Sequence, residues 1–150
     1  MDTKCRRRYE EQKYAYAAFL REIAEARQIM AQSTLKHPRA VLRELERDYQ
    51  ISDEEEFLAF LERYPSVAPL LFDIRSNIRR FFDEDRVRLE MFYDPEWPED
   101  GPKLVVNIQT HYASREALDR LHQFDDAWWI KSRSKIDAPL MVSFEHVRRV

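Results

Sequence analysis

The sequence predicts an α+β protein, with N-terminal helices followed by an α-β-β-α-β unit around a small mixed or antiparallel three-stranded sheet. Between residues 9 and 82, apolar residues recur at steps of three and four, the period of an amphipathic helix. From Arg86 onward, three segments alternate apolar and polar residues instead, the period of a half-buried strand. We expect residues 1–51 to form a helical extension and residues 52–150 the α+β domain, or the whole chain to form one compact domain.

The first predicted helix covers Tyr9–Met30. Arg6, Arg7 and Arg8 lie just before it or in its first turn, and basic residues at that end oppose the helix dipole, so they are not a capping device. We expect a solvated terminus there or, as the alternative, an arm that contacts phosphates. The apolar stripe of this helix consists of Tyr9, Tyr16, Phe19, Leu20, Ile23 and Met30.

Three further helices are expected before the first strand. The second helix covers Ser33–Gln50 with Pro38 in its first turn, the third begins at a capping box from Ser52 to Glu55, and Ser66 caps the fourth. The residues expected to face inward are Val41, Leu42, Leu45, Tyr49, Phe57, Phe60, Leu61, Tyr64, Leu70, Leu71, Ile74, Ile78, Phe81 and Phe82. The face opposite the fourth stripe carries Arg75, Arg79 and Arg80.

The alternating segments predict strands over Arg86–Tyr93, Lys103–Thr110 and Leu140–Glu145. The first two are expected to form an antiparallel hairpin, because the proline-rich segment Asp94–Pro102 that joins them reads as a loop. A helix capped by Ser114 should precede the last strand, with helices on one face of the sheet. The inner face of that helix is expected to consist of Leu118, Leu121, Phe124 and Trp128.

Composition excludes several classes of function. Gly101 is the only glycine, so the chain has no dinucleotide-binding loop, no phosphate-binding P-loop and no nucleophile elbow. The net charge of −3 gives no support to wholesale nucleic-acid binding. Cys5 is the only cysteine, which excludes an intrachain disulfide and a thiolate metal cluster. We expect no cofactor, no metal and no membrane association, and without a signal-peptide pattern we expect a cytoplasmic protein.

The helix before the last strand carries the candidate catalytic residues. Asp119, His122 and Asp126 are spaced i, i+3 and i+7, so they share one polar face, where a carboxylate beside an imidazole orients a general base or binds a metal. The same spacing is common on solvated helix faces. His111 and His146 lie near strand ends, where a lone histidine is more often a surface or hydrogen-bonded residue than a metal ligand.

Tryptophans are the candidate partner-binding residues. Trp128 is expected on the core stripe and Trp129 about 100° away, at the edge of the helix. Trp97 lies in the proline-rich loop, where an exposed indole is also expected. Exposed tryptophans are favoured anchors at protein interfaces. With Trp97 and Trp129 we include Tyr16 and Phe19 of the first helix as partner-binding candidates.

The segment from Phe57 to Val147 resembles a family of uncharacterised small bacterial α+β proteins, found largely in cyanobacteria. Its most specific part is the Phe-Asp-x-x-Trp-Trp motif that begins at Phe124, and Ala127 replaces an acid of the family's pattern, so no two-acid role is carried over. The resemblance implies no particular activity. It suggests an accessory or regulatory protein, for example the partner half of a toxin–antitoxin-like pair. It also rests on Pro69–Leu71, Ile78–Phe82, Leu89–Glu90, Asp94–Glu96, Leu104–Thr110 and Glu116–Leu118.

Together these observations favour a non-enzymatic protein-interaction or regulatory module that binds a protein partner or itself. Two alternatives stay open. The first is a small enzyme or metal-binding protein that uses Asp119, His122 and Asp126. The second is nucleic-acid binding through Arg6–Arg8 and the arginines at positions 75, 79 and 80.

Overall fold

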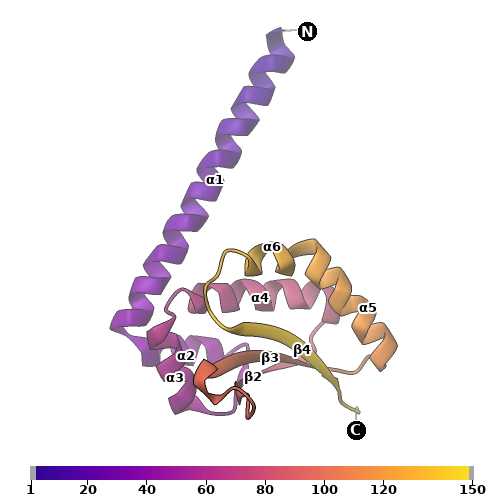
Figure 1. Cartoon of the computed structure of the whole chain (residues 1–150). Coiled ribbons are helices and arrows are strands. Elements are labelled where there is room, and N and C mark those ends of the chain that lie inside the picture. The colour runs from indigo at the N-terminus through magenta and orange to yellow at the C-terminus, as the bar shows by residue number, and fades with distance from the viewer. Residues whose placement is uncertain (1–2, 149–150) are drawn as a thin grey trace.

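The computed structural model describes residues 3–148 and shows an α+β fold, as the sequence predicts. One long helix, α1, stands away from a body that the other elements form (Figure 1). The helical elements are α1 (Thr3–Lys36), α2 (Pro38–Glu46), α3 (Glu54–Arg63), α4 (Val67–Phe82), the 3-10 turn η1 (Pro98–Asp100), α5 (Ser114–Phe124), the π-helical turn η2 (Asp125–Trp129) and α6 (Ile130–Arg133). The strands are β1 (Gln50–Ile51), β2 (Arg86–Tyr93), β3 (Pro102–Thr110) and β4 (Leu140–His146).

The sheet has four strands in the order β1-β2-β3-β4, so the expected number of three is wrong. The missed strand is β1, whose two residues Gln50 and Ile51 pair parallel with Arg88 and Leu89 of β2. Two residues are too few for an alternating pattern, so only the pairing itself identifies this strand. The predicted antiparallel pairing of β2 with β3 is confirmed, and β3 pairs parallel with β4, which makes the sheet mixed.

One face of the sheet is apolar and is covered by α4, α5 and α6 (Figure 1). The register places Val87 opposite Ile108 and Leu89 opposite Val106, and Val106 lies beside Val142 of β4. Side chains on one face of a strand recur every second residue, so these pairs form continuous rows against the helices. The largest fully buried side chains include Phe57, Leu61, Leu71, Ile74, Ile78, Phe82, Leu89, Leu104, Ile108 and Phe124.

The first two helices meet at a proline, and their boundaries differ from the predicted ones. Helix α1 runs on to Lys36, and α2 begins at Pro38, so the predicted start of the second helix at Ser33 is wrong. Proline has no N–H and pushes the preceding residue out of the helical region, and His37 accordingly has φ −138°. The inward residues predicted for α2 and the segment after it are all buried, namely Val41, Leu42, Leu45 and Tyr49.

The α2 side chains Val41 and Leu45 pack in the same core as Leu71 of α4 and Val106 of β3. Residues 38–51 therefore belong to the body, and α1 alone extends from it (Figure 1).

Two of the predicted helix caps are shifted by one residue. Asp53, not Ser52, is the N-cap of α3, and its carboxylate accepts a hydrogen bond from the backbone N–H of Glu56 at 3.3 Å. The Ser52 hydroxyl instead donates to the carbonyl of Leu89 in β2 at 3.1 Å. Ser114 is the first helical residue of α5 and not its cap.

The loop between β2 and β3 begins as the sequence predicts. A carboxylate oxygen of Asp94 accepts the backbone N–H of Glu96 at 2.9 Å, which forms an Asx-type turn. The loop ends at Gly101, whose φ of +73° is a conformation that glycine adopts at little cost. Trp97, between these two ends, is 57% exposed, in agreement with the predicted exposure.

Candidate functional site

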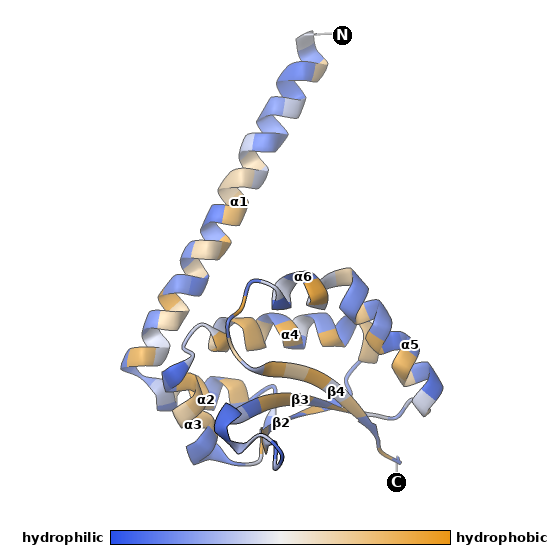
Figure 2. Ribbon diagram, in the orientation of Figure 1, coloured by the Kyte–Doolittle hydropathy of each residue, from blue (hydrophilic) through white to orange (hydrophobic). Residues whose placement is uncertain are grey.

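Most of α1 has no covering from its own chain. Every side chain from Thr3 to Glu22 is exposed, including Tyr16 at 64% and Phe19 at 56%. Hydrophobic segments recur along the part of the helix that stands clear of the body (Figure 2). Tyr9, Tyr16 and Ile23 are seven residues apart, the spacing that keeps side chains on one seam of a helix that packs against another helix. Two of the predicted partner-binding residues, Tyr16 and Phe19, therefore lie on an open apolar seam.

The C-terminal third of α1 holds the helix to the body. Arg27 donates to the carboxylate of Asp73 in α4 at 2.6 Å, and the side chain of Thr34 is buried. Ile23 and Met30 are half-buried. The helix is therefore anchored over its last turns and projects beyond them. No helix among residues 3–148 is both long and apolar enough to cross a lipid bilayer.

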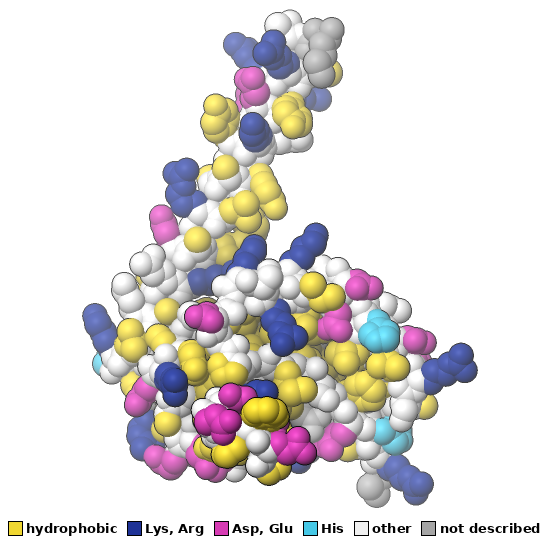
Figure 3. Space-filling view, in the orientation of Figure 1, with side chains coloured by type: hydrophobic (Ala, Val, Ile, Leu, Met, Phe, Trp, Pro, Cys, Tyr) yellow, Lys and Arg dark blue, Asp and Glu magenta, His cyan; other side chains and the backbone are white. Residues whose placement is uncertain are grey.

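A groove of about 490 Å³ lies where α1 leaves the body. Its apolar lining comes from Leu20 and Ile23 of α1, Leu70 of α4, Trp128 of η2, and Ile136. Because Tyr16 precedes Leu20 and Ile23 by one and two helical turns, the seam of α1 runs directly into this groove. The groove also has a basic rim, which consists of Arg27, Lys131 and Lys135. Figure 3 shows hydrophobic side chains along the middle of the projecting helix, above the body.

The structure reverses the predicted positions of the two adjacent tryptophans. Trp129 is only 4% exposed and stacks on Phe124, with ring centroids 6.3 Å apart, whereas Trp128 is half-buried and lines the groove. The cause is the π-helical turn η2, which holds one more residue per turn than an α-helix. That extra residue rotates the chain, so position 129 takes the inward direction predicted for position 128. Trp129 is thus a core residue in this structure, and Trp128 is the indole at the surface.

The inner face predicted for α5 also needs correction. Ala117 and Phe124 are fully buried, and Leu121 between them is half-buried, but Leu118 is exposed. The inward face thus runs from Ala117 to Leu121 and Phe124, at steps of four and three residues. Leu118 is the next residue after Ala117, so it points about 100° away from this face.

The candidate catalytic residues Asp119, His122 and Asp126 all lie exposed on α5 and η2. No hydrogen bond or ion pair joins them within residues 3–148. The described part of the chain also contains no cluster of three histidine, cysteine or acidic residues arranged to hold a metal ion. Partial burial raises the pKa of the neighbouring Asp125, and the nearby His122 offsets part of this rise.

The two arginine groups do not form one basic surface. Arg6, Arg7 and Arg8 lie in the first turns of α1, at the end remote from the body (Figure 1). Arg75 was expected on the solvated face of α4, but it is buried, and its side chain donates to the carbonyls of Asp48 and Asp85 at 3.2 Å each. Burial lowers the pKa of Arg75.

The other two arginines of that group are also engaged. Arg79 forms an ion pair with Asp48 at 3.1 Å, and Arg80 donates to the side chain of Asn77 at 3.2 Å.

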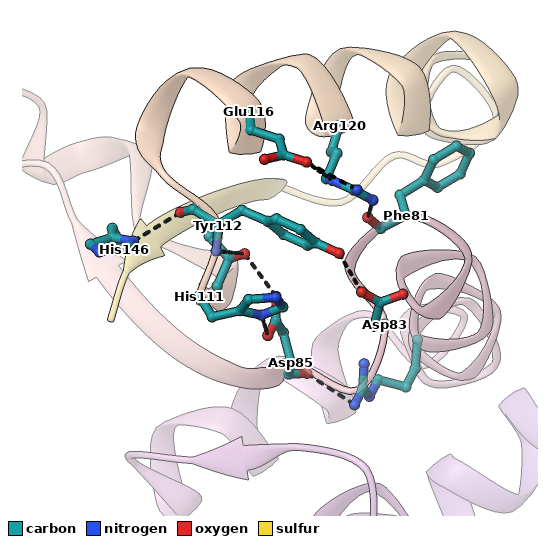
Figure 4. Close-up of polar contacts among 10 residues, drawn as sticks. Phe81, Asp83, Asp85, His111, Tyr112, Glu116, Arg120 and His146 are labelled. Atoms are coloured by element: carbon teal, nitrogen blue, oxygen red, sulfur yellow. Dashed lines mark hydrogen bonds and ion pairs between the residues drawn. The ribbon is translucent and has the colours of Figure 1, made fainter. Parts of the chain in front are cut away.

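A second polar cluster, which sequence reasoning missed, lies where β2 begins and β3 ends (Figure 4). The buried carboxylate of Asp85 contacts Nδ1 of His111 at 2.6 Å and accepts a hydrogen bond from the Thr110 hydroxyl at 2.7 Å. The signal for this cluster is the sheet register. Arg86 pairs with Gln109, so the residue before β2 and the residues at the end of β3 meet at one edge of the sheet.

Aromatic and charged side chains surround this cluster. The Tyr112 hydroxyl donates to the carboxylate of Asp83, a hydrogen bond that raises the pKa of Tyr112. The guanidinium of Arg120 lies 3.8 Å from the centroid of the Tyr112 ring and donates to the carbonyl of Phe81 at 2.7 Å (Figure 4). His146 is held by a hydrogen bond from Nδ1 to the carbonyl of Tyr112 at 2.8 Å.

Comparisons with protein-family models, with curated proteins and with solved structures find no match to this chain. The functional argument therefore rests on the geometry above.

Proposed function

We propose that this protein is an interaction module that self-associates through α1. Two copies pack their first helices against each other, and the apolar seam of each helix extends toward the groove of the other copy. The observation that carries this proposal is the run from Thr3 to Glu22, a helical stretch without a single side chain covered by its own chain. In water, helical stability comes mainly from tertiary packing of an amphipathic face, so this stretch needs a partner surface.

The exposed area of the seam approaches that of a small specific interface. An aromatic side chain buries roughly 150–250 Å². Tyr9, Tyr16 and Phe19 are each more than half exposed, so in two copies they alone offer on the order of 700 Å². Leu20 and Trp128 bring the total toward the roughly 1,200 Å² that specific interfaces bury at the least.

Charge favours an antiparallel arrangement of the two helices. A parallel pair would bring Arg6, Arg7 and Arg8 of both copies together, and like charges at such a distance repel. An antiparallel pair separates the two arginine groups and sets the basic N-terminal turns beside the segment of the other copy that carries Glu22 and Glu25. Neither of these glutamates forms an ion pair within residues 3–148. Such a pair has two-fold symmetry and is closed, so the expected assembly is a dimer.

The test is the mass in solution of a double variant on the seam. Tyr16→Lys with Phe19→Lys puts two charges into the proposed interface, and we expect sedimentation equilibrium to change from twice the mass of the chain to the mass of one chain. The matched control is Tyr14→Lys with Ala18→Lys, which adds the same charge on the opposite, exposed face of α1. The control should remain dimeric. A monomeric wild-type protein, or equal dissociation of both variants, would overturn the proposal.

A further inference from the structure

The structure contains a second hollow, independent of α1, at the edge of the sheet where β2 begins and β3 ends. It has a volume of about 560 Å³ and lies beside the Asp85–His111 pair, between the residue before β2, the last residues of β3 and the residues after β4. This volume is within the range of roughly 300–1,000 Å³ that is usual for small-molecule sites. The polar side chains that line it are Glu84, Asp85, Arg86, Gln109, His111 and Arg148.

The acidic side chains of this hollow are already engaged. One carboxylate oxygen of Asp85 faces Nδ1 of His111 at 2.6 Å, and the other accepts from Thr110 at 2.7 Å. Glu84 forms an ion pair with Arg79 of α4 at 3.7 Å. Both carboxylates of the lining thus have a hydrogen-bond or ion-pair partner within the protein.

The basic side chains have no such partner. Arg86 and Arg148 are exposed, and neither forms an ion pair within residues 3–148. The Nε2 atom of His111 has no hydrogen bond in the same part of the chain, while Asp85 fixes the orientation of the ring through Nδ1. The groups of the hollow that remain open to a ligand are therefore two guanidinium groups and one imidazole nitrogen.

From this arrangement we infer that the hollow binds a small molecule through a phosphate group. A phosphate dianion matches the two positive charges, and guanidinium groups bind phosphate oxygens through paired charge-assisted hydrogen bonds. Nε2 of His111 accepts a hydrogen bond from the P–OH of the monoanion, or donates to the dianion when the ring is protonated. The volume of the hollow leaves room for the organic part of the molecule beside the phosphate.

The experiment is an NMR titration of the full chain with inorganic phosphate at constant ionic strength, with chloride as the reference anion. We expect saturable shifts of the backbone amides of residues 84–86 and 109–111, with a dissociation constant of about 1–10 mM for this fragment of the ligand. The variant Arg86→Ala with Arg148→Ala should weaken binding by about tenfold or more, because charge-assisted contacts are lost. His111→Asn keeps an N–H donor for Asp85, and it should weaken binding by several-fold.

The matched control is Arg43→Ala with Arg133→Ala, which removes two exposed arginines that do not line the hollow. This control should bind within about twofold of the wild-type protein. Saturable shifts that only the first pair of substitutions abolishes would support the inference. The absence of shifts in residues 84–86 and 109–111, or equal weakening in both double variants, would overturn it. Both results are independent of whether the protein dimerises through α1.

Discussion

Asp83 has an unusual backbone conformation at the edge of the proposed phosphate site. It is the only non-glycine residue with positive φ within residues 3–148, at φ +55° and ψ −134°. The backbone N–H of Asp85 bonds to the carbonyl of Phe82 at 3.2 Å, so Asp83 takes the first central position of a tight turn, where glycine is preferred. A non-glycine residue in such a conformation costs on the order of 1–3 kcal/mol.

This strain predicts a difference between two substitutions that both remove the carboxylate. Asp83→Gly and Asp83→Ala each lose the hydrogen bond from Tyr112, but only glycine relieves the backbone. The glycine variant should therefore be more stable than the alanine variant by about 1 kcal/mol or more in urea unfolding. Equal stabilities of the two variants would show that the turn is not strained.

The buried Tyr49 makes stability depend on alkaline pH. Burial raises the pKa of Tyr49 well above its usual value, and its hydroxyl donates to the carbonyl of Leu71. Below about pH 10 the phenol is protonated in both folded and unfolded chains, so it contributes no pH dependence there. Above that pH the unfolded chain loses the proton while the folded chain keeps it. The free energy of unfolding should then fall by about 1.4 kcal/mol per pH unit from this group.

Tyr49→Phe is the variant that isolates this effect, because the pKa of Tyr112 is also raised and Tyr112 contributes to the same pH range. We expect the stability curves of wild type and Tyr49→Phe, measured by urea unfolding from pH 9 to pH 11, to converge as the pH rises. Parallel curves would mean that Tyr49 ionises in the folded protein as it does in the unfolded chain.

At the scale of elements, hydrophobic periodicity correctly predicted the elements that are long and regular. The stripe of α4 and the alternation of β2 are long and regular, and Ile74, Ile78, Val87 and Leu89 are buried as expected. Two elements carry no periodic signal. β1 is too short for one, and η2 changes the period of the helix in which it lies.

The sequence predicted site residues that share one helix, but not those that strand pairing brings together. Tyr16 and Phe19 lie on one helix, so their shared face follows from spacing alone. Asp85 and His111 are 26 residues apart and meet only because β2 and β3 pair in one register. Arg75 follows the polar face of α4 in sequence, yet it is buried because two backbone carbonyls from other segments face it.

The π-helical turn predicts opposite roles for the adjacent tryptophans. Trp129→Ala should cost about 3–5 kcal/mol, because it empties a buried site next to Phe124. Trp128→Ala should cost clearly less in unfolding free energy, but it should weaken dimerisation because Trp128 lines the groove beside α1. Urea unfolding and sedimentation of both variants make the comparison. A larger loss of stability for Trp128→Ala would instead indicate that Trp128 is the core residue, as a regular α-helix would place it.

At the scale of the whole molecule, the body and α1 are stabilised in different ways. The side chains that form the core begin at Val41 and end at Leu140, so the body contains its own core without the projecting part of α1. The projecting part is stabilised by its backbone hydrogen bonds and by contacts within the helix, such as the ion pair of Arg6 with Glu10 at 3.9 Å, while every side chain from Thr3 to Glu22 is exposed. Its order therefore depends on assembly, and assembly depends on protein concentration.

The orientation of the helices in the dimer can be tested with the cysteine that the chain already contains. Cys5 is exposed near the start of α1. A disulfide requires Cα atoms within about 7 Å, whereas antiparallel helices would place the two Cys5 residues tens of ångströms apart, at a rise of about 1.5 Å per residue. We therefore expect mild oxidation of the native dimer to give no intermolecular cross-link at Cys5.

In a Cys5→Ser background, single cysteines at Gln12 and Ala15 sample the middle of α1, where two antiparallel helices cross. At least one of them should cross-link efficiently on oxidation, as seen by non-reducing electrophoresis, because residues near a two-fold axis face their own copies. Efficient cross-linking at Cys5 itself would show that the helices are parallel and that the repulsion between the two arginine groups is offset by other contacts. Since both orientations bury the same seam, this result would overturn the antiparallel arrangement but not dimerisation through α1.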